Sequence, residues 1–284
     1  MNKFENIMIA SDIDGTFIWH GGMNNSRNEE KIKYFIENGG HFSFSSGRNH
    51  KDIYLIIPEL KSLCNMPCVL CNGTFCYDPA TDEISNPTFL DGQTALAFLR
   101  RINEVSGNRI GWRITDRNGF LIREDDEVIK KSMEKMNMLG LATRIMPFDK
   151  FDGEGYFKVV FTADDIPYML SVFEEMKKEF PTFGYTRSAV HLMELLPKGI
   201  GKASQLGYLK ERLQEKYGKM RLVGIGDFDN DADMLKFADI AMCPENATDG
   251  IKALCDVKLC HARDGAVADA IDKIERMIDG EIEI

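Results

Sequence analysis

The stretch IMIASDIDGT, residues 7–16, decides the fold of this 284-residue chain. Its first four residues, Ile7 to Ala10, form a continuous apolar run, which is typical of a strand buried on both faces of a parallel sheet. Asp12 and Asp14 follow at the end of this strand and are separated by one apolar residue, so their carboxylates lie on the same side. Two carboxylates at one place require a nearby positive charge. The stretch therefore predicts the first strand of an α/β sheet and a cation at its carboxyl end.

Helix and strand patterns alternate after this stretch and again near the end of the sequence. The first set is a helix at about 26–38, opened by a capping box at Ser26 to Glu29, a strand at 41–45, a helix at 51–57 and a strand at 67–70. The second set is a helix at about 202–217, a strand at 221–225, a helix at 232–237, strands at 240–243 and 257–260, and a helix at 266–278. Strands that alternate with helices predict a right-handed parallel sheet.

The pattern changes between about residues 86 and 196. Helices are expected at 91–105, 125–139 and 165–179, and strands at 109–115, 120–123, 156–162, 182–186 and 189–195. The strand pair around Asn118-Gly119 reads as a hairpin, and hairpins indicate a mixed or antiparallel sheet that cannot continue the parallel one. We therefore expect an α/β core formed by residues 1–85 and 197–284, with an α+β domain at residues 86–196 inserted into it.

The composition limits the classes of function. Acidic residues outnumber basic ones 45 to 35, and this net charge of -10 disfavours general binding to nucleic acid. No apolar run approaches the length of a membrane span, and the N-terminal region lacks the core of a signal peptide. The seven cysteines, an odd number, favour reduced thiols. We expect a cytoplasmic globular protein that binds neither nucleic acid nor membranes.

Polar residues beside glycine follow four of the expected parallel strands: Asp12 to Gly15, Ser46-Gly47, Asn72-Gly73 and Gly226-Asp227. Polar residues and glycine are common in turns of all kinds, so one such pair alone would not indicate a functional site. In an open α/β sheet, however, ligands bind outside the carboxyl ends of the strands, at the point where the strand order reverses. Four such sites together predict that these side chains line one crevice.

An acidic cluster after the strand at 221–225 supplies the second half of a metal site. Asp227 and Asp231, together with Asp12 and a backbone carbonyl, suit Mg²⁺, which also takes oxygen ligands from water and from substrate phosphate. The cluster is not a calcium-binding EF-hand loop, because Ala232 stands where that loop requires glycine. The sequence thus predicts a Mg²⁺ site.

The same residue types can carry phosphoryl transfer. The Asp12 carboxylate could attack phosphorus and form an aspartyl-phosphate. Asp14 could protonate the leaving alkoxide and then deprotonate the attacking water. Lys202 and the Ser46 hydroxyl could stabilise the charge on the transferred phosphoryl group.

Four motifs of the sequence resemble, in order and spacing, those of the haloacid dehalogenase (HAD) superfamily: Asp12 to Thr16, Ser46 to Arg48, Lys202, and Gly226 to Asp231. Asn72-Gly73 and the approach to Lys202 are similar to the Cof-type, subclass IIB sugar-phosphatase branch. The resemblance implies a Rossmann-like parallel-sheet core with an inserted α+β cap domain of the C2 type.

The resemblance also implies roles for single residues. The implied catalytic residues are Asp12 as nucleophile, Asp14 as acid and base, and Lys202. The implied Mg²⁺ ligands are Asp12, Asp14 through its carbonyl, Asp227 and Asp231. The implied phosphate-binding residues are Ser46, Gly47, Lys202 and Asn230, and candidate substrate contacts are Arg48 and Asn72. For Arg48, an ion pair between the core and the inserted domain is an equally open alternative.

We therefore expect a Mg²⁺-dependent phosphomonoester hydrolase that acts through an aspartyl-phosphate on sugar phosphates or similar small phosphorylated metabolites. Two alternatives remain open from the sequence. A phosphomutase could use the same phospho-aspartate, and a regulatory protein could bind a phosphate ligand without turnover.

Overall fold

The computed structural model describes residues 2–19 and 23–283. The chain falls into two compact units, which are described separately. The core unit comprises residues 1–48, 53–86 and 201–284, and the inserted unit comprises residues 49–52 and 87–200. The core unit is thus built from both ends of the chain.

The core unit contains the segments that alternate between strand and helix. Its first part contains β1 (Ile7–Ser11), β2 (Ile18–Trp19), β3 (Met23–Asn24), α1 (Ser26–Glu37), β4 (His41–Phe44), α2 (Ile53–Ile56), α3 (Leu60–Leu63), β5 (Cys68–Leu70), β6 (Phe75–Asp78) and β7 (Glu83–Ser85). Its second part contains α7 (Lys202–Tyr217), β14 (Arg221–Ile225), α8 (Ala232–Phe237), β15 (Ile240–Pro244), α9 (Asp249–Lys252), β16 (Val257–Leu259) and α10 (Ala266–Ile278). Short 3₁₀ turns lie at Cys71–Gly73, Asp229–Asp231 and Ala262–Asp264.

A five-stranded parallel sheet in the order β16-β15-β14-β1-β4 forms the centre of the core unit. Ser11 at the end of β1 pairs with Ile225 of β14 on one side and with Phe44 of β4 on the other. Three strands from distant parts of the sequence therefore end at the same edge. The predicted α/β class with a parallel-sheet core is confirmed.

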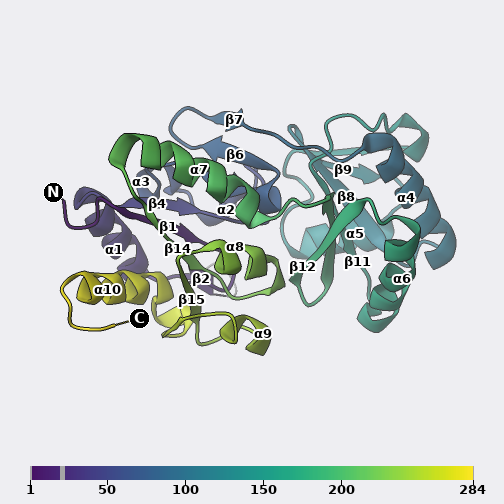
Figure 1. The fold of residues 1–284 in the computed structure, drawn as a ribbon. Helices are drawn as coiled ribbons and strands as arrows, with labels where there is room; N and C mark the ends of the chain where they lie inside the picture. The colour runs from purple at the N-terminus through teal and green to yellow at the C-terminus, as the bar shows by residue number, and fades with distance from the viewer. Residues whose placement is uncertain (1, 20–22, 284) are drawn as a thin grey trace. The chain divides into compact units, whose positions relative to one another are not determined.

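Helices cover both faces of this sheet (Figure 1). On one face, α7 and α8 bury Leu206 and Met234 against Met8 of β1 and Leu222 of β14. On the other face, α1 and α10 pack against each other, α1 lies along β4, and α10 lies along β15 and β16. With both faces covered, the strands must be apolar throughout, which explains the continuous apolar run in β1.

The strand predicted at residues 67–70 forms, but it does not join the parallel sheet as a full member. A single bridge between Ser45 and Val69 connects β5 to the segment after β4. The chain then returns after β5 as β6, which pairs with it in antiparallel fashion and carries β7. The predicted third strand therefore forms and lies parallel to the segment after β4, although only one bridge joins them. The sequence reading missed the hairpin with β6 on the other edge of β5.

The cap of α1 also differs from the prediction. The side chain of Asn25, not that of Ser26, accepts the hydrogen bond from the Arg27 N–H, and Ser26 is the first helical residue. Asparagine and serine are about equally good at this position. The prediction of a helix here is confirmed, and its capping residue lies one position earlier.

The inserted unit is a mixed α and β structure. Its elements are α4 (Gly92–Ser106), β8 (Gly111–Asp116), β9 (Gly119–Arg123), α5 (Glu127–Lys135), β10 (Thr143–Met146), β11 (Lys158–Thr162), α6 (Ile166–Glu179), β12 (Phe183–Ala189) and β13 (Leu192–Pro197), with a 3₁₀ turn at Phe148–Lys150. They form a six-stranded sheet in the order β10-β9-β8-β11-β13-β12. All its pairings are antiparallel except that of β9 with β10.

The two faces of this sheet have separate apolar clusters. Helices α4 and α6 pack on one face through Phe98 and Phe173, which contact Phe161 of β11. On the other face, α5 packs through Ile129 and Met133 near β9. The sequence reading missed β10, because its residues Thr143 to Met146 are only partly buried and show no clear alternation.

In the part of the chain that the structure describes, no helix combines the length and apolar character needed to span a membrane.

Candidate active site

The first acidic pair lies at the carboxyl end of the central strand. The Asp12 N–H donates to the Ile225 carbonyl over 2.8 Å, which extends the pairing of β1 with β14 by one residue. Gly15 then turns the chain with φ +91°, and a Cβ on it would lie 2.4 Å from Oδ2 of Asp227. Only glycine fits this turn, because an L side chain is disfavoured at this φ and would collide with the carboxylate. The DxDGT stretch therefore brings Asp12 close to Asp227.

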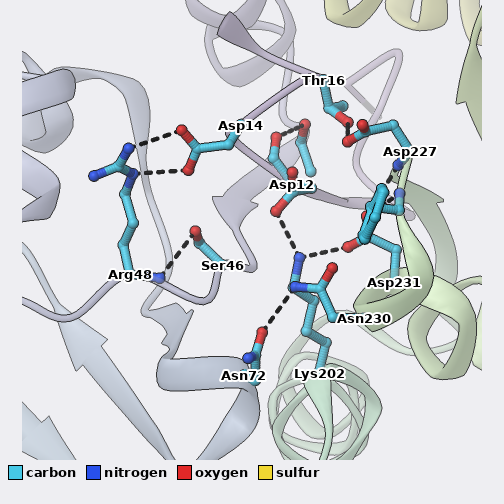
Figure 2. Close-up of polar contacts among 12 residues, drawn as sticks. Asp12, Asp14, Thr16, Ser46, Arg48, Asn72, Lys202, Asp227, Asn230 and Asp231 are labelled. Atoms are coloured by element: carbon cyan, nitrogen blue, oxygen red, sulfur yellow. Dashed lines mark hydrogen bonds and ion pairs between the residues drawn. The ribbon is translucent and has the colours of Figure 1, made fainter. Parts of the chain in front are cut away.

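Lys202 connects the two acidic clusters (Figure 2). It is the first residue of α7, and its side chain is fully buried. Its Nζ donates to Oδ1 of Asp12 over 2.6 Å and also bonds Oδ1 of Asp231. Lysine is almost never fully buried unless it is paired, so these two carboxylates account for its position.

Gly73 fixes the backbone that carries Lys202. Gly73 has φ +91°, and a Cβ on it would lie 1.9 Å from the carbonyl oxygen of Gly201. The turn at Cys71–Gly73 thus packs directly against the start of α7. Any side chain at residue 73 must push α7 away from Asp12.

Gly73→Ala is therefore expected to destabilise the protein by about 2–4 kcal/mol, since it adds a backbone collision to an unfavourable φ. Gly107→Ala is the matched control, because Gly107 also has positive φ, +56°, but has open space around it. This control should cost about 1 kcal/mol. Urea unfolding of both variants measures the difference, and equal losses would contradict the role given to the Gly73 contact.

Asp231 shapes the loop after β14. Its Oδ2 accepts hydrogen bonds from the backbone N–H groups of Asp227, at 2.9 Å, and Phe228, at 3.1 Å. Its Oδ1 bonds Lys202. The Thr16 hydroxyl donates to Oδ1 of Asp227 over 2.9 Å. Both carboxylates are buried and held in place by named donors.

The charges of this cluster do not balance. Three buried carboxylates, those of Asp12, Asp227 and Asp231, face the single ammonium of Lys202. Burial raises the pKa of Asp12 to about 7; Lys202 opposes this shift and Asp231 adds to it. Burial, followed by the charges of Asp12 and Asp231, also raises the pKa of Asp227 well above its ordinary value. Burial lowers the pKa of Lys202, but the two carboxylates outweigh it and the net shift is upward.

A divalent cation fits this cluster. One ligand oxygen from each of Asp12, Asp227 and Asp231 can be chosen so that all three lie within 4.8 Å of one another. Carboxylate oxygens are the ligands that Mg²⁺ prefers, and two positive charges would offset the excess of negative charge. Among the described residues, Asp12, Asp227 and Asp231 form the one group of histidine, cysteine or acidic side chains whose ligand atoms lie close enough together to hold a metal ion.

The raised pKa of Asp12 predicts a pH-dependent stability for the metal-free protein. The folded protein holds the Asp12 proton up to about pH 7, whereas the unfolded chain loses it near its ordinary value of 3.8. Stability is therefore lost as pH rises from about 4 to 7. The free energy of unfolding of Asp12→Asn, measured with urea in chelator, should therefore increase relative to that of the unaltered protein as pH rises through this window. The expected gain is about 2–4 kcal/mol.

Mg²⁺ should reverse this loss, adding about 2.7 kcal/mol at a hundred times its dissociation constant. The control is Asp272→Asn, which removes a surface carboxylate paired with Arg27 and Lys31. If the difference in unfolding free energy between Asp12→Asn and the unaltered protein does not change with pH, the raised pKa of Asp12 is contradicted.

Comparison with known proteins identifies the family of the chain. The family model for haloacid dehalogenase-like hydrolases matches residues 9–271. The chain belongs to this family. The match spans all four sequence motifs as well as the inserted unit, so the predicted membership is confirmed, and the chain is a HAD-type hydrolase.

Several proteins that are similar to this HAD-type hydrolase are named as phosphatases. The 5-amino-6-(5-phospho-D-ribitylamino)uracil phosphatase YwtE of Bacillus subtilis is 24% identical over 267 residues, which cover 86% of this chain and 89% of the relative. A haloacid dehalogenase-like hydrolase of Bacteroides thetaiotaomicron has a similar structure, with a TM-score of 0.78, 23% identity and coverage of 94% and 98%. The HAD subclass IIB sugar phosphatase BT4131 also matches, with a TM-score of 0.78, 16% identity and coverage of 97% and 99%.

The second motif of the HAD-type hydrolase follows β4. Ser46 is buried, and its hydroxyl accepts the Arg48 N–H over 3.2 Å. A Cβ on Gly47 would lie 3.2 Å from Oδ1 of Asn72, so the two segments are in close contact. The Arg48 guanidinium reaches the Asp14 carboxylate, which is half exposed.

Asn72 and Asn230 contact each other. The Asn230 amide donates to Oδ1 of Asn72 over 3.0 Å. Asn72 is buried and has left-handed backbone angles, φ 55° and ψ 41°, which are uncommon outside glycine. Such conformations persist where the surrounding structure imposes them. All ten predicted site residues thus lie in the core unit. Figure 2 shows them close together except Gly47, which it does not label and which lies against Asn72. Their individual roles remain predictions.

Sequence reasoning missed two residues that hold the site. Thr16 belongs to the first motif, but the sequence did not indicate that its hydroxyl donates a hydrogen bond to Asp227. Asn246, in the loop after β15, donates from Nδ2 to the Gly15 carbonyl over 2.7 Å, and its Oδ1 accepts the Ala262 N–H over 2.9 Å. An asparagine two residues after the end of a parallel strand was the available indication for Asn246.

Proposed function

We propose that this HAD-type hydrolase is a Mg²⁺-dependent phosphomonoester hydrolase that forms an aspartyl-phosphate on Asp12. The observation that carries the proposal is the position of the Asp12 carboxylate. One of its oxygens is fixed by the buried Lys202, and no donor among the described residues contacts the other. A carboxylate held in this way has one oxygen available to attack phosphorus.

The first half of the reaction transfers the phosphoryl group to the protein. An Asp12 oxygen forms a bond to phosphorus, and the bond between phosphorus and the ester oxygen breaks. Asp14 gives a proton to the departing oxygen, so that the product leaves as an alcohol. Lys202 and the Ser46 hydroxyl would stabilise the phosphoryl oxygens by charge and by hydrogen bonding.

The second half regenerates Asp12. Asp14, now a carboxylate, takes a proton from water, and the water oxygen bonds to phosphorus as the bond to Asp12 breaks. The products are inorganic phosphate and the free carboxylate. A divalent cation held by Asp12, Asp227 and Asp231, with the Asp14 carbonyl as a further candidate ligand, would offset the negative charge that the phosphoryl group brings.

We propose a small phosphorylated metabolite, such as a sugar phosphate, as the substrate. The similarity to YwtE and to the sugar phosphatase BT4131, over most of each chain, supports this class. The net charge of -10 supports a small ligand rather than nucleic acid. The cytoplasmic location remains a prediction from the sequence.

The test is an assay of inorganic phosphate release from a panel of phosphate monoesters, with Mg²⁺ and with chelator. The panel should include sugar phosphates, phosphorylated alditols and a phosphorylated ribitylaminouracil. Release that requires Mg²⁺ supports the proposal. An isomerised sugar phosphate without phosphate release would indicate a phosphomutase, and binding without turnover of any ester would indicate a regulatory protein.

A further inference from the structure

Arg48 makes a two-point contact with Asp14. Its Nε donates to Oδ2 and its Nη2 donates to Oδ1, each over 2.8 Å. The Asp14 side chain is 51% exposed and that of Arg48 is 21% exposed. Figure 2 shows this pair on one side of Asp12, while Lys202 meets Asp12 on another side. The geometry is the parallel, two-bond arrangement that fixes both the position and the plane of a carboxylate.

The backbone of Arg48 is itself fixed. Its N–H donates to the Ser46 hydroxyl over 3.2 Å, and its carbonyl accepts the Cys71 N–H over 2.8 Å. Cys71 and Asn72 both have left-handed backbone angles, so this turn has little freedom to shift. Arg48 therefore starts from a rigid part of the core unit and can act as a fixed anchor.

Asp14 retains acceptor sites in this arrangement. A carboxylate has about four lone-pair sites, and the two bonds to Arg48 occupy two of them. The exposure of Asp14 leaves the others free to carry the proton that passes to an ester oxygen, or to accept a proton from water. Arg48 thus restricts the orientation of the carboxylate and does not block its chemistry.

We infer that Arg48 is a positioning residue, which acts on phosphoryl transfer through Asp14 and does not bind the transferred phosphoryl group. The inference rests on the proposed function, because it concerns the proton that Asp14 gives to the leaving oxygen. It differs from the two roles that the sequence leaves open for Arg48, a contact with the substrate and an ion pair between the core and the inserted domain. Its main consequence is that Arg48 should matter most for esters whose leaving oxygen needs a proton.

The test compares two substrates in one protein preparation. An alkyl phosphate that the unaltered protein hydrolyses leaves as a basic alkoxide and needs the proton, whereas 4-nitrophenyl phosphate leaves as a stable phenolate. Arg48→Gln is expected to reduce the first-turnover rate on the alkyl ester by about 30–100-fold, and that on the aryl ester by less than about 3-fold. The ratio of the two losses does not depend on the fraction of folded protein.

Two variants sharpen the comparison. Arg48→Lys keeps the charge but lacks the two-point contact, so it should restore only part of the alkyl ester rate. In an Asp14→Asn background, Arg48→Gln should cause no further loss, since residues that act through each other are not additive. Arg27→Gln is the control, because Arg27 also pairs with an aspartate, Asp272, at the surface of the core unit.

Binding of inorganic phosphate gives a second readout that does not require turnover. In titration calorimetry with Mg²⁺ present, Arg48→Gln should bind phosphate within about 2-fold of the unaltered protein. A 10-fold weaker affinity, equal losses on both esters, or full additivity with Asp14→Asn would overturn the inference. A protein that hydrolyses neither ester contradicts the proposed function, whereas the phosphate affinities still decide the role of Arg48.

Discussion

Asp12→Asn is expected to lower kcat for phosphate ester hydrolysis by about 10⁴-fold or more, because it removes the proposed nucleophile. The asparagine amide is a poor nucleophile, yet it has nearly the shape of the carboxylate. The substitution also removes one of the three negative charges that face Lys202, so the variant should still fold. Activity and stability are therefore expected to change in opposite directions above pH 7 in chelator. Few surface substitutions would produce this combination.

The measurements are single-turnover phosphate release and mass spectrometry of the quenched protein. The unaltered protein should carry a phosphoryl group on the peptide that contains Asp12, and the variant should carry none. Asp272→Asn serves again as the control, because its surface carboxylate only joins ion pairs. Retention of more than about one hundredth of the activity by Asp12→Asn would exclude Asp12 as the nucleophile.

Lys202→Met is expected to have the largest effect on stability, about 3–5 kcal/mol. The substitution keeps much of the volume of the side chain but leaves Asp12 and Asp231 buried without their shared ammonium. Removing one partner of a buried ion pair costs more than the pair itself contributes, because the remaining charge stays desolvated. The loss should be largest at high pH, where the Asp12 carboxylate, whose pKa burial raises to about 7, is ionised, and smaller with Mg²⁺ present.

Lys210→Met is the matched control in the same helix. Lys210 pairs with Asp239, whose side chain is 42% exposed, so its removal should cost less than about 1 kcal/mol. Urea unfolding of both variants at two pH values measures the contrast. Equal losses of unfolding free energy for the two variants would show that the burial of Lys202 adds nothing to the effect of removing a surface ion pair.

The sequence predicts correctly those helices and strands whose apolar residues recur at a regular spacing. The helix predicted at residues 202–217 and the strand at 221–225 have the bounds that the structure shows. Both carry strong apolar patterns and clear end signals, which local reasoning can use. The strands β6 and β10 were missed, because both are short and neither shows a clean alternation. Their hydrogen bonds to β5 and β9 are tertiary facts that no local pattern records.

The site was predictable in its residue types and not in its contacts. Rules for strand ends placed Asp12, Ser46 and Asp227 at one edge of the sheet, and the structure has them there. The pairing of Arg48 with Asp14 could not be read from the sequence, because a long flexible side chain has several partners within reach. The contact between Asn72 and Asn230 joins residues 158 positions apart and depends on the packing of the whole core unit.

The central position of β1 has a consequence for the synthesis of the protein. Asp12 lies 190 residues before Lys202, and Thr16 lies 211 residues before its partner Asp227. At about 5–20 residues per second, the ribosome needs about 10–40 s to deliver Lys202 after Asp12. During this interval the apolar strand β1 lacks its neighbour β14, and residues 87–200 are synthesised before β14 follows. The inserted unit can thus fold on the ribosome before the active site exists, and the nascent N-terminal segment must remain soluble in the meantime.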